Sequence, residues 1–148
     1  MSCTKETYRI AAEEHLKRAQ AHFDTGSYYL AHYLSGLAIE CYLRAWIGRK
    51  NKTFYRQHAI DFLARVSQFY SIIPSQQNKD YSTFFATANL RWKCNHRYYS
   101  ERQFFQEMTD IKAEFESRGD HWKEILARTM LNCAYEIYKL GEAKWNKI

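Results

Sequence analysis

The chain has 148 residues and a net charge of +6, and aromatic residues make up 17% of it. This length is enough for one domain with a buried core, and the aromatic content excludes a disordered chain. The basic charge favours an anionic partner, with nucleic acid as the first candidate. With only 5 Gly and 1 Pro, breakers are scarce and long helices are favoured.

Two helices are predicted at the start of the chain. Apolar residues recur every three or four positions over Lys5–Asp24, and Thr4 stands where an N-cap belongs. A second helix is predicted over Tyr28–Ile47, with Gly48 as its end. It is the most apolar part of the chain, which is typical of a helix that is central in its bundle or shared with another subunit. Its expected core face is Leu30, Leu34, Leu37, Ala38, Cys41 and Ala45, broadened by Tyr33, Ile39 and Trp46.

Glu40 interrupts the apolar run of this second helix. A carboxylate is seldom buried without a partner, so Glu40 either faces solvent or meets a cation. The pattern alone favours solvent.

The middle of the chain predicts a short third helix after His58, a surface loop over Ser71–Asp80 and a fourth helix over Tyr81–Lys93. Ser100 and Gln103 then match a capping box. They open a fifth helix that should run to about Ser117 and stop at Gly119, with Phe104, Phe105, Met108, Ile111 and Phe115 facing inward.

Asp120 should cap a last helix whose apolar spacing continues to Leu140. No segment alternates at period two over the length of a strand. The sequence therefore predicts an all-α fold of five to six helices in a single domain, residues 1–148.

Several classes of protein are disfavoured. The four cysteines form no C-x-x-C pair, which predicts reduced thiols, and no secretory signal or membrane-length apolar run is present. We therefore expect a cytoplasmic protein without a membrane segment. His15 and His22 would lie about 10 Å apart along a helix, too far for one metal ion. No metal and no cofactor is expected, since phosphate-loop and hydrolase motifs are also missing.

The stretch from Arg91 to Ser100 gathers three cations, a histidine and three aromatics between two predicted helices. Arg91 and His96 together suit RNA cleavage without a metal: His96 would move a proton at the 2′-hydroxyl, and Arg91 would stabilise charge on the phosphorane. On one continuous helix they would point about 140° apart, so the helix must end between them or a second subunit must contribute. Taken locally, a helix-terminal imidazole and an ordinary surface cation explain the two residues more simply.

The chain also resembles the HEPN family. Residues 27–45 resemble its second-helix signature, His58 before Ile60 and Leu63 resembles the start of its next helix, and Arg91-x4-His96 with Tyr98 resembles its Arg-x4-6-His motif. The resemblance implies a helical bundle with an up-and-down core, usually a homodimer whose two motifs meet in a composite cleft. Competent members are metal-independent ribonucleases.

Two functions stay open on this resemblance. In toxin members paired with a minimal nucleotidyltransferase, a tyrosine at the Tyr98 position can be modified, and Glu40 matches a supporting polar position. Competent members often have Asn, Asp or His where this chain has Trp92. Many non-catalytic members instead carry an Arg-Tyr pair, which Arg97-Tyr98 fits. The resemblance thus implies either a ribonuclease of the toxin or defence type or a module that binds a nucleotide or a nucleotidyltransferase.

Overall fold

The computed structural model describes residues 4–51, 53–116 and 121–147, and these contain helices and no strand. The all-α prediction is confirmed. The α-helices are α1 (Lys5–Asp24), α2 (Tyr28–Lys50), α3 (Ile60–Val66), α4 (Asn78–Arg91), α5 (Glu101–Glu107), α6 (Thr109–Glu116) and α7 (Trp122–Lys144). Three short 3-10 helices are η1 (Phe69–Ile72), η2 (Ser75–Gln77) and η3 (Cys94–Tyr98).

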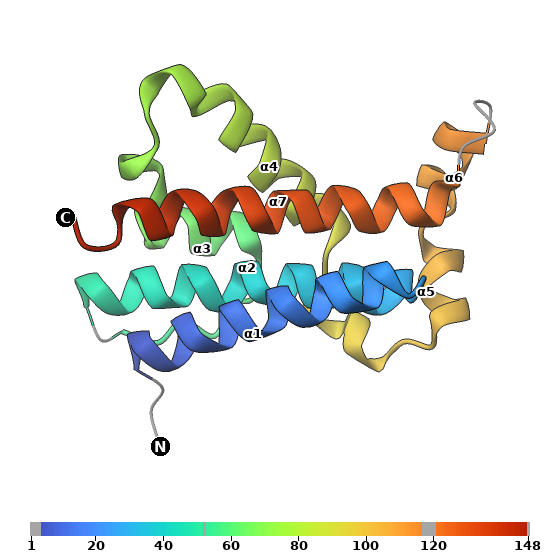
Figure 1. Ribbon diagram of the computed structural model, residues 1–148, viewed down its shortest axis with the longest axis horizontal. Coiled ribbons are helices and arrows are strands. Elements are labelled where there is room, and N and C mark those ends of the chain that lie inside the picture. The colour runs from blue at the N-terminus through green and yellow to red at the C-terminus, as the bar shows by residue number, and fades with distance from the viewer. Residues whose placement is uncertain (1–3, 52, 117–120, 148) are drawn as a thin grey trace.

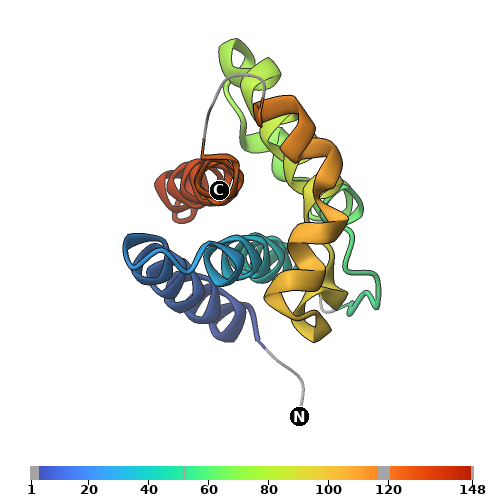
Figure 2. The ribbon, with the colours of Figure 1, turned by 90° about the vertical axis from the view of Figure 1, so that its right-hand side faces the viewer.

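The long helices α1, α2 and α7 run side by side and form the body of the molecule (Figure 1). Gly26, with a φ of 82°, makes the turn that folds α1 back along α2. Figure 2, turned by 90°, shows that α3 to α6 lie together on one side of the body formed by α1, α2 and α7. Helix α2 thus has neighbours on most of its circumference, which fits its apolar sequence.

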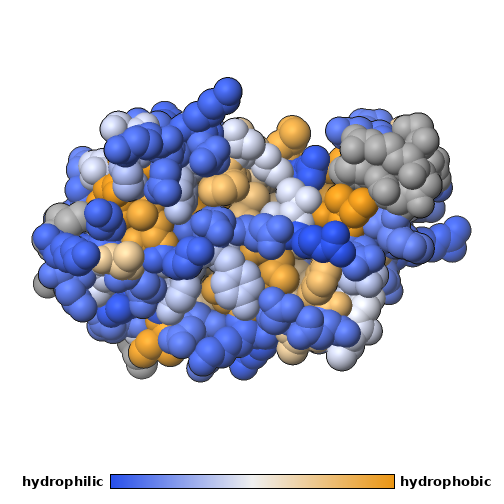
Figure 3. All heavy atoms as spheres, turned by 45° about the horizontal axis from the view of Figure 1, so that its top comes forward, coloured by the Kyte–Doolittle hydropathy of each residue, from blue (hydrophilic) through white to orange (hydrophobic). Residues whose placement is uncertain are grey.

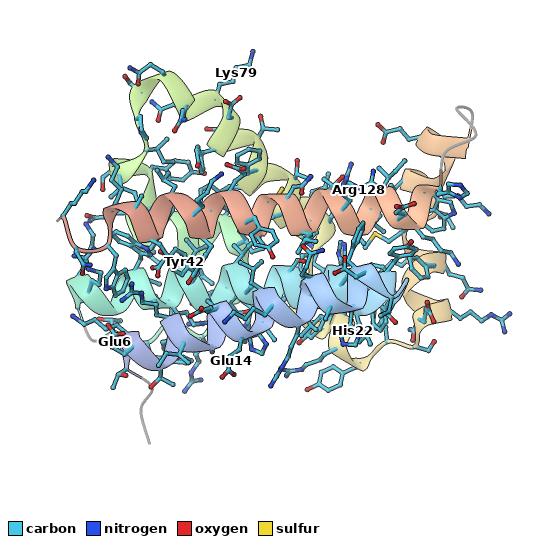
Figure 4. All side chains as sticks on the ribbon, viewed as in Figure 1. Glu6, Glu14, His22, Tyr42, Lys79 and Arg128 are labelled. Carbon is cyan, nitrogen blue, oxygen red and sulfur yellow. The ribbon has the colours of Figure 1, made fainter. Side chains whose placement is uncertain are left out.

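A polar cluster joins the three long helices. The Tyr42 side chain of α2 lies between α2 and α7 (Figure 4), and its hydroxyl donates to Glu142 Oε2 over 2.9 Å. Arg9 of α1 donates from Nε and Nη2 to the same carboxylate over 2.9 Å. The Tyr42 ring fits there because position 141 is glycine: a Cβ at Gly141 would lie 2.3 Å from it.

The N-terminal helices match the prediction except at two points. Helix α1 has the expected bounds, and Thr4 caps it by accepting the Thr7 N–H over 3.1 Å. Helix α2 is three residues longer than predicted, because Gly48 keeps a right-handed conformation and the Asn51 N–H still bonds to the Ile47 carbonyl. The expected core face is also partly wrong. Leu30 is 40% exposed, whereas Ile39 and Trp46 are buried as predicted. Tyr42 and Leu43, which were not predicted for this face, are buried as well.

The predicted loop over Ser71–Asp80 is also wrong. It contains the end of η1, the whole of η2 and the start of α4 at Asn78, three residues earlier than expected. Ile72 and Ile73 are buried in the main core, so this segment folds back onto the body instead of running over the surface.

The predicted fifth helix is divided in two. Ser100 caps it as expected, accepting the Gln103 N–H over 3.1 Å, but α5 ends at Met108 and α6 begins directly after it. Phe104, Phe105 and Met108 are buried as predicted in a second small core with Leu126 of α7, and Ile111 packs against it. The bend at Met108 lets this segment wrap around the end of α7. The expected stop at Gly119, the cap at Asp120 and the side chain of Phe115 lie outside the described residues.

The described helices include none that is both long and apolar enough to cross a bilayer. On the face shown in Figure 3, hydrophilic side chains dominate and the apolar ones form small separate patches. Among the described cysteines, Cys41, Cys94 and Cys133 are free thiols; Cys3 lies outside that part of the chain.

Candidate functional site

The segment after α4 is anchored to α2. Helix α4 ends at Arg91, and Trp92 continues in an extended conformation, buried against α2. Its indole Nε1 donates to the Tyr33 carbonyl over 3.0 Å, and His32 Nε2 donates to the Arg91 carbonyl over 3.0 Å. A Cβ at Gly36 would lie 2.0 Å from the Trp92 ring, so the small residue at position 36 is what allows this contact.

His96 is held inside the protein. Its side chain is 1% exposed, and Nδ1 accepts the Lys93 N–H over 3.2 Å, which places the ring proton on Nε2. Nε2 faces Glu107 Oε2 at 3.5 Å, and the ring packs edge-on against Phe104 with centroids 5.0 Å apart. Burial lowers the pKa of His96, against the opposing effect of Glu107. His96 Nε2 makes no hydrogen bond in the described structure, so the packing of the ring on Phe104 is what joins η3 to α5.

Arg91 does not join His96. The helix does end between the two residues, as helical geometry required, yet the described residues include no hydrogen-bond or ion-pair partner for the Arg91 guanidinium. Burial raises the pKa of the Cys133 thiol to about 11, and the charge of Arg91 opposes that rise. The charge of Arg91 also acts on the buried His32, whose ring centre lies 6.1 Å from that of His96, and no hydrogen bond or ion pair joins the Arg91 and His96 side chains in the described structure.

His32 of α2 sits beneath this segment and has a consequence for acid stability. It is fully buried, Nδ1 has no partner in the described structure, and burial lowers its pKa from 6.5 to about 3. Below pH 6.5 the imidazole is protonated in the unfolded chain but stays neutral in the folded protein. The contribution of His32 to the free energy of unfolding is therefore fully present above pH 6.5 and is lost as the pH drops toward 3.

We expect His32 to cost roughly 2–3 kcal/mol of unfolding free energy between about pH 6.5 and 4.5. Urea denaturation at both pH values should show this loss in the wild type and a smaller loss in His32→Gln, whose amide can still donate to the Arg91 carbonyl. The same pH dependence in both proteins would contradict the assignment.

Arg97 and Tyr98 lie on the surface. Arg97 Nη2 donates to the Tyr98 hydroxyl over 2.7 Å, and the guanidinium stands 4.7 Å from the Tyr98 ring centre. Tyr98 is 73% exposed. Tyr33 of α2 connects this pair with Glu40: burial raises the pKa of Tyr33, Arg97 lowers it and Glu40 raises it. These charged groups therefore occupy one neighbourhood.

Glu40 is buried and meets a guanidinium and an imidazole. The expectation that it faces solvent is wrong, and the alternative holds: Glu40 Oε2 accepts from Arg44 Nε over 3.1 Å and from His58 Nδ1 over 2.9 Å. Sequence reasoning missed Arg44 as a site residue, although Glu40 and Arg44 have the i, i+4 spacing of a helical ion pair. For His58, the sequence indicates only a position just before the third helix.

Arg44 also fixes the connection that leads from α2 to α3. Its Nη1 donates to the Tyr55 carbonyl over 2.7 Å and its Nη2 to the Gln57 carbonyl over 3.0 Å. A segment without helical structure of its own is thereby held on α2 by one buried guanidinium, which Glu40 neutralises.

The described part of the chain contains no grouping of three or more His, Cys, Asp or Glu side chains that could hold a metal ion. The candidate site is a cationic and aromatic surface around η3, together with the buried Glu40–Arg44 pair and the partly exposed His58 that it contacts.

Comparison with known families agrees with this architecture. The HEPN domain model matches residues 6–144, nearly the whole chain, and the protein belongs to the HEPN family. The resemblance to this family is confirmed. Comparisons with curated proteins and with solved structures gave no match.

Proposed function

We propose that this HEPN protein is a cytoplasmic binding module that takes nucleotide phosphates on the surface formed by Arg97 and Tyr98. The observation that carries the proposal is the difference in exposure within one motif: Tyr98 is 73% exposed beside Arg97, whereas His96 is 1% exposed. A ligand can reach the Arg-Tyr pair without any rearrangement of the fold.

The chemistry of the pair suits a nucleotide. A guanidinium binds phosphate oxygens through two parallel hydrogen bonds, and an exposed phenol ring offers a face on which a base can stack. The net charge of +6 adds long-range attraction for such anions.

The partners expected for the family belong to the same proposal. We propose a homodimer that uses α2 and α4, where Leu30 and Leu90 are exposed apolar side chains. A nucleotidyltransferase partner would bring a nucleotide to the Arg97–Tyr98 surface, with the Tyr98 hydroxyl as the accessible group.

Arg97→Ala is expected to weaken binding of a fluorescent ATP analogue about tenfold or more, because a charge-assisted contact to phosphate is lost. Lys139→Ala is the matched control, since Lys139 is an exposed cation on α7 paired only with Glu136 at 3.6 Å. Fluorescence anisotropy measures both. No ATP binding by the wild type, or equal binding by both variants, would overturn the proposal.

A second candidate function is metal-independent ribonuclease activity at a composite dimer cleft. The favouring observation is that the Arg91 guanidinium lacks a partner in the described structure while His96 is held with its proton on Nε2. Arg91 and the Nε2–H of the neutral imidazole would donate hydrogen bonds to the phosphorane while the 2′ oxygen attacks phosphorus and the 5′ oxygen leaves. Water would take the 2′ proton and protonate the 5′ oxygen. This route requires dimerisation to uncover His96 from Glu107 and Phe104.

The ribonuclease candidate predicts cleavage of single-stranded RNA in EDTA that Arg91→Ala and His96→Ala each abolish. His22→Ala, in α1, should cleave like the wild type. Denaturing gels of labelled RNA measure the rate. Cleavage that persists in both variants, or that never exceeds the buffer blank, rejects this candidate and leaves the binding module.

A further inference from the structure

The connection from α2 to α3 presents an exposed aromatic ring in a fixed position. Phe54 is 64% exposed, yet the buried Arg44 guanidinium lies 5.0 Å from its ring centre and also bonds to the carbonyls of Tyr55 and Gln57. A large apolar ring held on the surface of a basic protein is suited to stacking with a base.

His58 stands in the same connection and is oriented from behind. Its Nδ1 donates to both oxygens of Glu40 over 2.9 and 3.1 Å, while 44% of the side chain is exposed. No described residue hydrogen-bonds to His58 Nε2. A carboxylate that fixes one ring nitrogen leaves the other directed to a ligand, and a protonated imidazole so oriented can donate to a phosphate oxygen.

These groups line up with the Arg97–Tyr98 pair along α2. Tyr33, which is next to Arg97, and Glu40 and Arg44, which hold His58 and Phe54, lie on one face of the helix. The eleven residues from Tyr33 to Arg44 span about 17 Å at about 1.5 Å per residue. Figures 1 and 2 show the connection after α2 and the segment after α4 on the same flank of α2.

Charges of both signs are exposed on these segments. Arg56, Lys93 and Arg97 are exposed cations, Asp61, Glu101 and Glu107 are exposed acids, and the carboxylate of Glu40 is buried beside Arg44. A length of about 17 Å corresponds to about five stacked steps at ~3.4 Å per nucleotide, more than one nucleotide covers.

We propose that Phe54, His58, Arg97 and Tyr98 form one strip that binds a single-stranded nucleic acid, with bases stacked on Phe54 and Tyr98 and phosphates bound by His58 and Arg97. Arg44 and Glu40 are positioning residues behind the strip. The Arg97–Tyr98 end rests on the function proposed above, whereas the Phe54 and His58 end is new.

The test compares a labelled RNA hexamer with a labelled dinucleotide and with ATP by fluorescence anisotropy. We expect the hexamer to bind at least tenfold more tightly than the dinucleotide, and Phe54→Ala and His58→Gln each to weaken hexamer binding about five- to tenfold. Both variants should bind ATP normally. Tyr135→Ala and His22→Gln are controls for an exposed ring and an imidazole elsewhere. Phe54→Leu keeps apolar cover without stacking, and His58→Gln keeps a donor for Glu40, so loss of fold does not produce the result.

The outcomes separate the two proposals. Hexamer binding that depends on Arg97 but not on Phe54 or His58 overturns the strip and leaves the Arg97–Tyr98 surface. A hexamer bound no more tightly than the dinucleotide also overturns the strip. Binding of neither ATP nor hexamer overturns both proposals. A DNA hexamer bound as well as the RNA supports the strip and shows that it reads base and phosphate without the 2′-hydroxyl.

Discussion

Glu40→Ala is expected to lower the free energy of unfolding by about 3–5 kcal/mol, because it leaves the buried Arg44 guanidinium without its counter-charge. The melting temperature should fall by roughly 10 °C for a domain of this size. Urea denaturation followed by circular dichroism measures the effect. The control is Glu13→Ala, which removes the exposed Glu13–Lys17 pair of 3.2 Å and should cost less than about 1 kcal/mol. Equal losses in the two variants would contradict a buried, coupled Glu40.

A double variant separates the charge from the shape of this cluster. Glu40→Leu together with Arg44→Leu removes both charges. The double variant should therefore lose clearly less free energy of unfolding than the two single variants lose together. Hexamer binding should not recover, because the carbonyls of Tyr55 and Gln57 lose the guanidinium that holds the connection. Recovery of both properties would show that Arg44 does not position Phe54.

The sequence predicted best what depends on neighbours in the chain. Helix α1 has its predicted bounds because a regular apolar stripe, a side-chain cap at Thr4 and a glycine turn at Gly26 are all local signals. The apolar excess of α2 indicated a helix enclosed on most sides. Its buried face was predicted in part: Ile39 and Trp46 are buried as expected, but Leu30 is 40% exposed, because the pattern alone does not show which side of the helix lacks a close neighbour.

Errors arose where distant segments decide the local structure. The sequence predicts a loop at Ile72 and Ile73, because the main core that buries them is built from segments far away in the chain. Met108 lies within an unbroken helical pattern, and only the second core around Leu126 gives a reason for the chain to bend there. Gly48 does not end α2 as predicted, because a glycine ends a helix through a left-handed conformation that Gly48 does not adopt.

The candidate site shows the same division. That Arg91, His96, Arg97 and Tyr98 gather at one helix end is visible in the sequence. That His96 is buried while Tyr98 is exposed is not, because the cover over His96 comes from Phe104 of α5 and His32 of α2. The pairing of Glu40 with Arg44 was available from their spacing, whereas His58, eighteen residues further along, could be paired with Glu40 only from the fold.

Gly36→Ala should disrupt the fold and the site together. The new Cβ would lie 2.0 Å from Cδ1 of the Trp92 ring, and Trp92 is buried with its Nε1 bonded to the Tyr33 carbonyl. Either the indole moves or α2 and the segment after α4 separate, at a cost of about 3 kcal/mol. Because Trp92 leads directly into η3, we also expect ATP binding at Arg97 to weaken severalfold. Urea unfolding followed by tryptophan fluorescence, and anisotropy with the ATP analogue, measure the two effects.

Gly48→Ala is the matched control, since it makes the same change in the same helix. There the nearest atom is Cβ of the exposed Lys5, at 2.9 Å in the first turn of α1. The backbone of this first turn must shift to relieve the contact, since Lys5 Cα would lie at 3.3 Å, but alanine favours the helix over glycine by about 1 kcal/mol, so the net loss should be clearly smaller than in Gly36→Ala. If Gly36→Ala is as stable as Gly48→Ala and binds ATP normally, Trp92 does not connect the packing of α2 to the Arg97–Tyr98 surface. If it loses stability but keeps ATP binding, Trp92 supports the fold. The surface is then positioned by the bonds of the Tyr29 hydroxyl to the His96 and Tyr99 carbonyls and by the bond from the Lys93 N–H to His96 Nδ1.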